Sequence, residues 1–533
     1  MATMQDAVSP EQVKNLIHGS EELSLLDVRE EGEFSQGHLL YASSLPLSRL
    51  ELAADALVPR RATRIVVLDG DGGSLAARAA RRLGELGWTD VAIMRGGIAA
   101  WRDSGYEIFT GVNVPSKAFG EFVEHEYGTP HIEASELKRR IDAGEKILIL
   151  DSRTADEFEA MSIPGALSCP GAELVYRAPA LVDSPRMLVV VNCAGRTRSI
   201  IGAQSLINAG IDNPVVALKN GTMGWHLAGL ELAHGATAAA PPPSPEGLSR
   251  ARAAAARVAQ RFGVRRIDAQ ELLRLEEGAD SHCLYRLDVR TPQEYRAGHL
   301  EGWRSAPGGQ LVQATDRYVG TLHSRIVVGD DDGVRAVLTA SWLVQMGWEN
   351  VFAIELDLVG RKLETGPEPQ RILGETGSVE IVDALALRQM LEHGTAVVID
   401  LANSLEFRNS HIQGAWWAIR ARLSDALARL PRTGTVVFTS ADGMLARLAA
   451  ADLRDTPGLR AMALAGGTAA WRDAGLPMAA GTDRMADEPV DVWYRPYDRS
   501  DQVEAAMRSY LTWEVDLPRQ IERDGDARFR LFR

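Results

Sequence analysis

The sequence has little cysteine and no long hydrophobic run. Its 533 residues include 3 cysteines, Cys169, Cys193 and Cys283, which are too few for a disulfide framework and are not spaced as zinc ligands. No apolar stretch approaches the roughly 20 residues that a membrane helix requires. The opening residues, MATMQDAVSPEQVKNLI, have neither the basic nor the apolar region of a signal peptide. We therefore expect a cytoplasmic protein that contacts no membrane.

The sequence also has fewer positively charged than negatively charged residues. The chain has 58 Lys and Arg against 72 Asp and Glu, a formal net charge of −14, which argues against a nucleic-acid partner. Neither a P-loop nor a dinucleotide fingerprint is present, so we expect no cofactor and no metal. The chain is too long for one ordinary core and its length suggests about three or four domains.

One pattern occurs four times along the chain. In each copy an apolar strand ends in an aspartate, and these aspartates are Asp27, Asp151, Asp288 and Asp400. A short helix with an acidic-aromatic pair follows, then a second apolar strand, a helix rich in Ala, Leu and Arg, and a further short strand. This alternation predicts α/β domains with mainly parallel sheets flanked by helices.

The copies divide the chain into segments. We expect domains at 1–112, 125–236, 262–370 and 377–482, a linker with a helix at 237–261, and a C-terminal tail at 483–533. The Pro- and Ala-rich linker suggests two pairs of domains. The tail is rich in aromatic residues, so we expect it to pack on a domain or a subunit interface. A Gly-rich turn before Trp closes three copies and is eroded in the third.

The stretch 187–210, MLVVVNCAGRTRSIIGAQSLINAG, stands out because a cysteine follows its predicted strand. In open α/β sheets, chemistry lies at the carboxyl ends of strands. The N-terminus of the following helix, the loop N–H groups, Arg196 and Arg198 would favour a thiolate over a thiol at Cys193. We interpret Cys193 as an activated nucleophile; the alternative is a buried structural cysteine.

These features together resemble the rhodanese family of sulfurtransferases. The matching residues are Asp151-Ser152-Arg153, Glu157 and Phe158, Pro164–Ala166, the loop Cys193–Arg198, and the Gly-rich turn before Trp225. The resemblance implies four tandem rhodanese-like domains, of which only the second keeps the nucleophile. The equivalent position is Asp69 or Gly70 in the first copy, Asp330 in the third and Ser440 in the fourth. Copies one, three and four are therefore expected to be inactive, and to shape or cover the cleft of the second or to make subunit contacts.

For the site, the resemblance implies a thiosulfate sulfurtransferase that carries sulfur as a persulfide on Cys193. A small-molecule donor, thiosulfate or 3-mercaptopyruvate, and a thiol or cyanide acceptor would be its partners. Whether the chain forms a homo-oligomer stays open. We expect the loop N–H groups to cradle the persulfide. We also expect a positive φ at Gly195 and an oxyanion bound by the loop arginines. The predicted substrate-binding residues are Ala194, Gly195, Arg196, Thr197, Arg198, Ser199 and Arg153. For Arg153 two roles stay open, contact with substrate or an ion pair with Asp151 that fixes the neighbouring loop.

Three alternatives remain. A cysteine phosphatase or arsenate reductase would share the fold, but the phosphatases use a loop one residue longer than Cys193–Arg198. A sulfur carrier, scaffold or sensor would form the persulfide with little turnover. Cys169 is either a resolving thiol for that persulfide or a small residue that fills a strand end.

Overall fold

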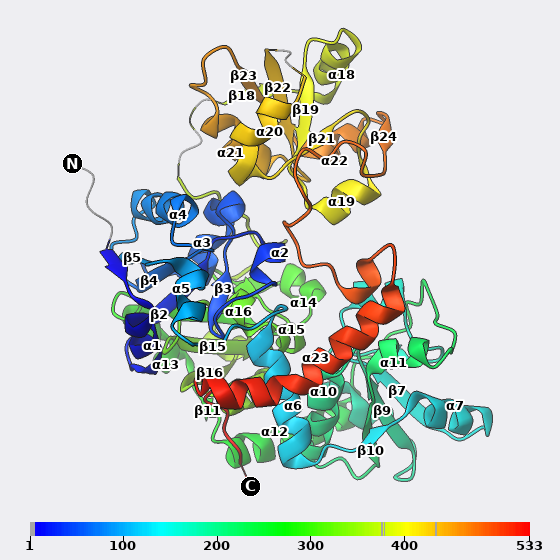
Figure 1. The fold of residues 1–533 in the computed structure, drawn as a ribbon. Helices are drawn as coiled ribbons and strands as arrows, with labels where there is room; N and C mark the ends of the chain where they lie inside the picture. Colours follow the sequence, from blue (N-terminus) through cyan, green and yellow to red (C-terminus); the bar gives the residue numbers. More distant parts are fainter. Residues whose placement is uncertain (1–5, 375–376, 378, 432–433, 533) are drawn as a thin grey trace.

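The computed structural model describes residues 6–374, 377, 379–431 and 434–532. It contains four α/β units, a long connecting helix and a C-terminal tail (Figure 1). The predicted start at residue 1 and end at residue 533 lie outside the described residues.

The first two units have the same order of elements. The strands of the first unit are β1 (Asp6–Val8), β2 (Leu23–Asp27), β3 (Ala42–Ser44), β4 (Arg64–Leu68) and β5 (Val91–Met94). Its helices are α1 (Pro10–His18), α2 (Glu31–Phe34), η1 (Leu47–Arg49), α3 (Leu50–Leu57), α4 (Ser74–Glu85) and α5 (Gly97–Asp103), and α6 (Val114–Tyr127) leads to the second unit. The second unit has strands β6 (His131–Ile132), β7 (Ile147–Asp151), β8 (Leu167–Ser168), β9 (Leu188–Asn192) and β10 (Val215–Leu218). Its helices are α7 (Ala134–Asp142), α8 (Ala155–Ala160), α9 (Glu173–Arg177), η2 (Ala178–Ala180), α10 (Thr197–Ala209) and α11 (Gly221–Leu227).

The third and fourth units each add a short two-stranded sheet. After α12 (Pro245–Phe262), the third unit has strands β11 (Arg265–Arg266), β12 (Leu284–Asp288), β13 (His299–Leu300), β14 (Arg304–Ser305), β15 (Arg325–Asp330), β16 (Asn350–Glu355) and β17 (Leu363–Glu364). Its helices are α13 (Ala269–Glu277), α14 (Pro292–Ala297), α15 (Gly308–Gln313), α16 (Thr315–Tyr318), α17 (Arg335–Gln345) and η3 (Leu356–Val359). The fourth unit has strands β18 (Glu380–Val382), β19 (Val397–Asp400), β20 (His411–Ile412), β21 (Trp416–Trp417), β22 (Thr435–Thr439), β23 (Arg460–Leu464) and β24 (Met478–Ala479). Its helices are α18 (Ala384–Glu392), α19 (Ser404–Asn409), η4 (Arg420–Arg422), α20 (Leu423–Arg429), α21 (Met444–Asp452) and α22 (Gly467–Asp473).

The four main sheets share one topology. Each has five strands, in the orders β1-β5-β4-β2-β3, β6-β10-β9-β7-β8, β11-β16-β15-β12-β14 and β18-β23-β22-β19-β21, and all of their pairings are parallel. The predicted α/β class with four tandem units is therefore confirmed. In the third unit the 3-10 helix η3 stands where α5, α11 and α22 close the others, which fits the eroded closing motif.

Local sequence explains where the elements of the second unit begin. Thr154 starts α8 with a capping box, in which its side chain accepts from the Glu157 N–H and the Glu157 carboxylate accepts from the Thr154 N–H. In β9, Val189 and Val191 belong to one core cluster while Val190 belongs to another. Strands of a parallel sheet are covered on both faces, which is why this run is apolar throughout.

The second and third units share one hydrophobic core. The cluster that holds Val191 continues through α12 into α17 of the third unit, and the Trp342 Nε1–H donates to Ser205 Oγ at 2.8 Å. Ser244 caps the start of α12 and Gly263, with φ of 65°, ends it. The expected division into two pairs at this linker is wrong, because α12 packs between α9, α10 and α17 instead of spacing two halves apart.

The tail contacts all four units, and in the fourth the Ser404 N–H donates to Asp491 Oδ2 at 2.8 Å. It contains η5 (Pro496–Asp498) and α23 (Val503–Asp524), and α23 crosses in front of α6 as the long red helix of Figure 1. Its end is fixed to the first unit by an ion pair between Lys14 Nζ and Asp526 Oδ1 at 2.7 Å. It also reaches the third unit, where the Arg530 N–H donates to the Gln345 carbonyl at 2.8 Å.

Among the described residues, no helix combines the length and the apolar content that crossing a bilayer requires.

Candidate active site

Cys193 follows the last residue of β9 and precedes α10 by a short loop. The first backbone hydrogen bond of this helix runs from the Ile200 N–H to the Arg196 carbonyl at 3.1 Å. The N–H groups of residues 197–199 therefore lie at the open end of the helix, where the dipole favours negative charge. This places the loop predicted to cradle a persulfide at a helix N-terminus.

A buried polar network fixes the strands beneath this loop. Asn192 Nδ2 donates to Asp151 Oδ2 at 2.8 Å and to Thr222 Oγ1 at 3.1 Å, so the ends of β7 and β9 and the Gly-rich turn are joined. Arg153 Nε and Nη2 donate to the two Asp151 carboxylate oxygens at 2.8 and 2.7 Å. The Arg153 side chain is 0 % exposed and does not line the cavity above Cys193. Of its two possible roles, the structure supports the ion pair with Asp151 and not contact with substrate.

The Gly-rich turn holds the loop directly. The Thr222 and Met223 N–H groups donate to the carbonyls of Cys193 and Ala194 at 2.7 and 2.9 Å. Gly221 has φ of 55°, and a Cβ atom there would lie 2.3 Å from the Cys193 carbonyl oxygen. A glycine is required at this position for both reasons.

Gly195 has a different role from the one predicted. It is not among the residues with positive φ, so the expected left-handed conformation is wrong. A Cβ atom at this position would lie 3.0 Å from Met223 Cε, 3.1 Å from Glu514 Oε2 and 3.4 Å from Tyr510 Cε1. Glycine therefore leaves room for side chains of the C-terminal helix, which approaches the loop closely.

The electrostatic setting of Cys193 differs from the expected one. Its side chain is buried, and this burial raises the pKa of the thiol. The charge of Arg198 and a hydrogen bond with Ser199 lower that pKa, while Glu514 raises it. The Sγ–H donates to Ser199 Oγ at 3.5 Å, and the Ser199 hydroxyl donates to the Arg196 carbonyl at 2.7 Å. The net shift is toward a higher pKa, which is opposite to the bias toward thiolate that the sequence predicted.

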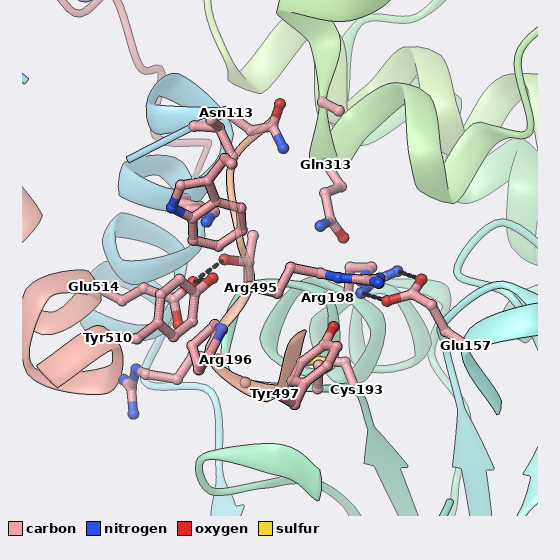
Figure 2. Close-up of a pocket in the computed structure, with 18 of the residues that line it drawn as sticks. Asn113, Glu157, Cys193, Arg196, Arg198, Gln313, Arg495, Tyr497, Tyr510 and Glu514 are labelled. Carbon is pink, nitrogen blue, oxygen red and sulfur yellow. Dashed lines mark hydrogen bonds and ion pairs between the residues drawn. The ribbon is translucent and has the colours of Figure 1, made fainter. Parts of the chain in front are cut away.

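The two loop arginines are not equivalent. Arg198 forms a bidentate pair with Glu157, with N–O distances of 2.6 and 2.8 Å. Arg196 pairs with Glu121 at 2.6 and 2.7 Å and also with Glu124. Figure 2 shows the Arg196 guanidinium turned away from Cys193. Both arginines line the cavity above Cys193, but it is Arg198 whose charge acts on the thiol. The expected oxyanion contact by the two arginines stays a prediction.

Above Cys193 lies a cavity of about 450 Å³. Residues 194–198 line it together with Met223 and Glu157 of the same unit. The remaining lining comes from other parts of the chain: Glu31, Val112, Asn113 and Lys117, then Gln310, Gln313, Ala314, Arg317 and Tyr318, then Leu405, and finally Val492, Trp493, Arg495, Pro496, Tyr497, Asp498, Tyr510 and Glu514. The other units and the tail therefore cover the cleft of the second, as expected for copies without the cysteine. Ser199 lies below the cavity, fully buried.

The equivalent loops show where the N–H groups point. In the third unit the Asp330 carboxyl group accepts from the N–H groups of Gly333, Val334 and Ala336 at 2.9, 3.0 and 2.9 Å. In the first unit the equivalent residue is Asp69, whose Oδ2 accepts from the Ala76 N–H at 2.9 Å. These carboxyl groups occupy the amide cradle that is open around Cys193 in the second unit.

The other two cysteines, Cys169 and Cys283, do not line this cavity. Cys169 is completely buried outside the cavity lining, and burial raises its pKa, so the structure gives no support to a resolving thiol. Cys283 is buried where the first and third units meet, and its backbone N–H donates to Glu22. In the part of the chain that the structure describes, no group of three or more metal-ligating side chains is assembled.

Sequence reasoning missed the residues that other segments bring to the site. Lys117, Tyr497, Tyr510 and Glu514 all line the cavity, and Figure 2 shows the last three around the loop. The aromatic residues of the tail indicated that it packs on another part of the protein, but they did not indicate which part. Asn192 was also missed, since a polar residue at the end of a strand has many possible roles.

Comparisons with known proteins agree with this architecture. The rhodanese-like domain family model matches residues 9–104, 133–228, 268–360 and 383–474. A crystal structure of thiosulfate sulfurtransferase from Pseudomonas aeruginosa superposes with a TM-score of 0.94 at 46% identity and covers 99% of this chain and 100% of that one. Among curated proteins, an HTH-type transcriptional regulator of Mycobacterium tuberculosis is 34% identical over 111 residues, 20% of this chain and 48% of the regulator, so the chain spans about half of that relative. A putative sulfur carrier protein of Bacillus subtilis is 24% identical over 136 residues, 24% of this chain and 72% of that protein. Since the family model matches four segments that make up most of the sequence, the chain belongs to the rhodanese family and is built from four rhodanese-like domains.

Proposed function

We propose that this protein is a sulfurtransferase that moves a sulfane sulfur from thiosulfate to a small thiol or cyanide through a persulfide on Cys193. The observation that carries the proposal is the position of Cys193, a lone thiol at an open amide cradle facing a cavity. The similarity to a thiosulfate sulfurtransferase over the full length of both chains supports the same donor.

In the first step the Cys193 thiolate attacks the outer sulfur of thiosulfate. The new Cys–S bond forms as the S–S bond of thiosulfate breaks, and sulfite leaves with the bonding electron pair. The proton of the thiol leaves to solvent water before the attack, and the positive charge of Arg198 stabilises the resulting thiolate. The persulfide keeps one negative charge, which the N–H groups of residues 197–199 and Arg198 stabilise.

In the second step an acceptor takes the outer sulfur. Cyanide attacks that sulfur, thiocyanate forms, and the electron pair of the Cys193 S–S bond returns to the thiolate. A small thiol takes the sulfur in the same way and becomes a persulfide. No redox partner is needed, because each step exchanges one bond to sulfur for another.

The covering of the cavity favours small substrates over a protein partner. Cys193 is 2 % exposed, and the tail and the third unit lie over it. A volume of about 450 Å³ suits a small ligand, whereas a protein thiol would have to displace Tyr497 and its neighbours. This supports turnover with small molecules over the carrier or scaffold alternative. The six-residue loop Cys193–Arg198 is shorter than that of the phosphatases, which argues against phosphate esters as substrates.

The test is thiocyanate formation from cyanide, with thiosulfate or 3-mercaptopyruvate as donor, together with the intact mass of the protein. We expect thiosulfate to give turnover and a mass gain of one sulfur. Cys193→Ser should lose both, with a rate at least about a thousandfold lower, while Cys169→Ser and Cys283→Ser keep them. A persulfide without turnover would favour the carrier, and activity only on aryl phosphates would refute the proposal.

A further inference from the structure

One buried cation faces the cavity without an oxygen partner. Lys117 of α6 is 3 % exposed and lines the cavity. Its Nζ lies 4.9, 4.6 and 4.8 Å from the ring centroids of Trp493, Tyr510 and Trp513. Within the described part of the chain, this Nζ makes no hydrogen bond or ion pair, and it is not among the atoms that are both fully buried and unpaired, so part of its surface stays accessible. Three aromatic faces stabilise an ammonium group, but they do not replace a hydrogen-bond acceptor.

The same face of α6 lies on the loop that carries Cys193. A Cβ atom at Gly120, one turn after Lys117, would lie 2.9 Å from Thr197 Cγ2. Glu121, four residues after Lys117, pairs with Arg196 of the loop. Residues three and four apart on a helix share a face, so Lys117 is directed to the loop and its cavity.

Charged groups on three helices, α10, α16 and α23, influence the pKa of Lys117. Glu514 of α23 and Asp316 of α16 raise its pKa, whereas Arg198 of α10 and Arg317 of α16 lower it. Burial is the largest influence and lowers the pKa to about 8. The two oxygens of the Glu514 carboxylate differ: Oε1 accepts from the Tyr510 hydroxyl at 2.8 Å and from Thr197 Oγ1 at 3.3 Å, whereas Oε2 is buried without a hydrogen-bond partner.

We propose that Lys117 binds the oxyanion end of the sulfur donor while Cys193 receives its sulfane sulfur. The inference rests on the proposed function and deepens it, because it names the residue that binds the sulfonate end of thiosulfate. Uncharged polysulfides lack the group that Lys117 would bind.

Binding without chemistry provides the first test. Thiosulfate is titrated into the Cys193→Ser chain by calorimetry, with and without Lys117→Met. We expect Lys117→Met to weaken binding at least about tenfold and Lys117→Arg to restore most of it, since Arg keeps the charge. In the Cys193→Ser chain, Kd should rise as pH increases through about 8, and the Lys117→Arg version should lack this rise.

Turnover provides the second test. Lys117→Met should raise KM for thiosulfate about tenfold or more with a smaller change in kcat, and should affect an uncharged organic trisulfide little. Lys14→Met is the matched control. Lys14 also pairs with the tail, at Asp526, and lies over two aromatic rings, but it does not line the cavity.

Each result separates the two proposals. Binding that depends on Lys117 in a protein without turnover would keep the anion site and refute the proposed function. Turnover with a KM unchanged in Lys117→Met would keep the function and refute the anion site. Equal losses in binding and in thermal stability for Lys117→Met and Lys14→Met would also refute it, because Lys117 would then act only to hold α23 in place.

Discussion

The carboxyl group of Asp330 accepts a hydrogen bond from the backbone N–H of Ala336, 2.9 Å away, six residues along the same loop. Cys193 and Ser199 have the same relationship in the second domain, where the backbone N–H of Ser199 lowers the pKa of the thiol. In the third domain the carboxyl oxygen atoms of Asp330 therefore occupy the amide cradle, whereas the equivalent cradle of the second domain stays open. The following predictions test this arrangement and the fold around it.

The charge of Arg198 is the largest influence that lowers the pKa of Cys193. Arg198→Met should raise this pKa further, so the alkylation rate with iodoacetamide should reach its midpoint at higher pH. The persulfide also loses its nearest cation, and kcat/KM for thiosulfate should fall about tenfold or more. Arg198→Lys should lie between, because it keeps the charge but not the bidentate pair with Glu157.

Glu514 acts in the opposite direction on the same thiol. Its charge raises the pKa of Cys193, so Glu514→Gln should shift the alkylation profile to lower pH. The amide oxygen can still accept from Tyr510, which keeps the local packing. A shift in the same direction for Arg198→Met and Glu514→Gln would show that disruption of the loop, and not charge, moves the pKa.

Gly195 should not tolerate a methyl group. Gly195→Ala places a Cβ atom 3.0 Å from Met223 Cε and 3.1 Å from Glu514 Oε2, so the ends of these two side chains must move. We expect KM for thiosulfate to rise and limited proteolysis to cut the tail faster. The matched control is Gly70→Ala in the equivalent loop of the first domain, where no atom lies within 4 Å of the added Cβ. Unchanged kinetics in Gly195→Ala would contradict the close approach of the tail.

Asp151 of the second domain pairs with Arg153. Among the residues that the structure describes, Asp400 of the fourth domain has no such arginine partner. Its burial raises its pKa to about 7, well above the value of about 3.9 in an unfolded chain. The folded state then binds the proton more tightly, so this contribution to stability is complete below about pH 4 and is lost as pH rises through about 7. Asp400→Asn should therefore raise the melting temperature near pH 9 but not near pH 4, as measured by thermal scanning. A stabilisation that is equal at both pH values would exclude titration as the cause.

Trp342 connects the second and third domains. It is 3 % exposed and donates to Ser205 across the boundary between them, so Trp342→Ala should cost about 3–5 kcal/mol. Hydrogen exchange during urea unfolding should show both domains opening together. Trp471→Ala, in the separate core of the fourth domain, should destabilise that domain alone. Independent opening of the second and third domains in Trp342→Ala would argue against a shared core.

The fold of each domain and the position of Cys193 could be predicted from the sequence alone. Strands with apolar runs, capped helices and glycine turns are local features, and their order repeats four times, so the α/β class and the position of Cys193 after β9 followed from pattern alone. The loss of the cysteine in three copies was equally visible, as Asp69, Asp330 and Ser440.

The surroundings of Cys193, in contrast, depend on the tertiary structure. Arg196 pairs with Glu121 on α6, and Lys117, Tyr497 and Glu514 come to Cys193 from segments far away in the chain. Such contacts depend on how domains and tail pack, and no local pattern encodes them. The pKa of Cys193 has the same origin: its direction is set by burial under the tail and by Arg198 and Glu514, and both burial and distance between charges exist only once the chain is folded.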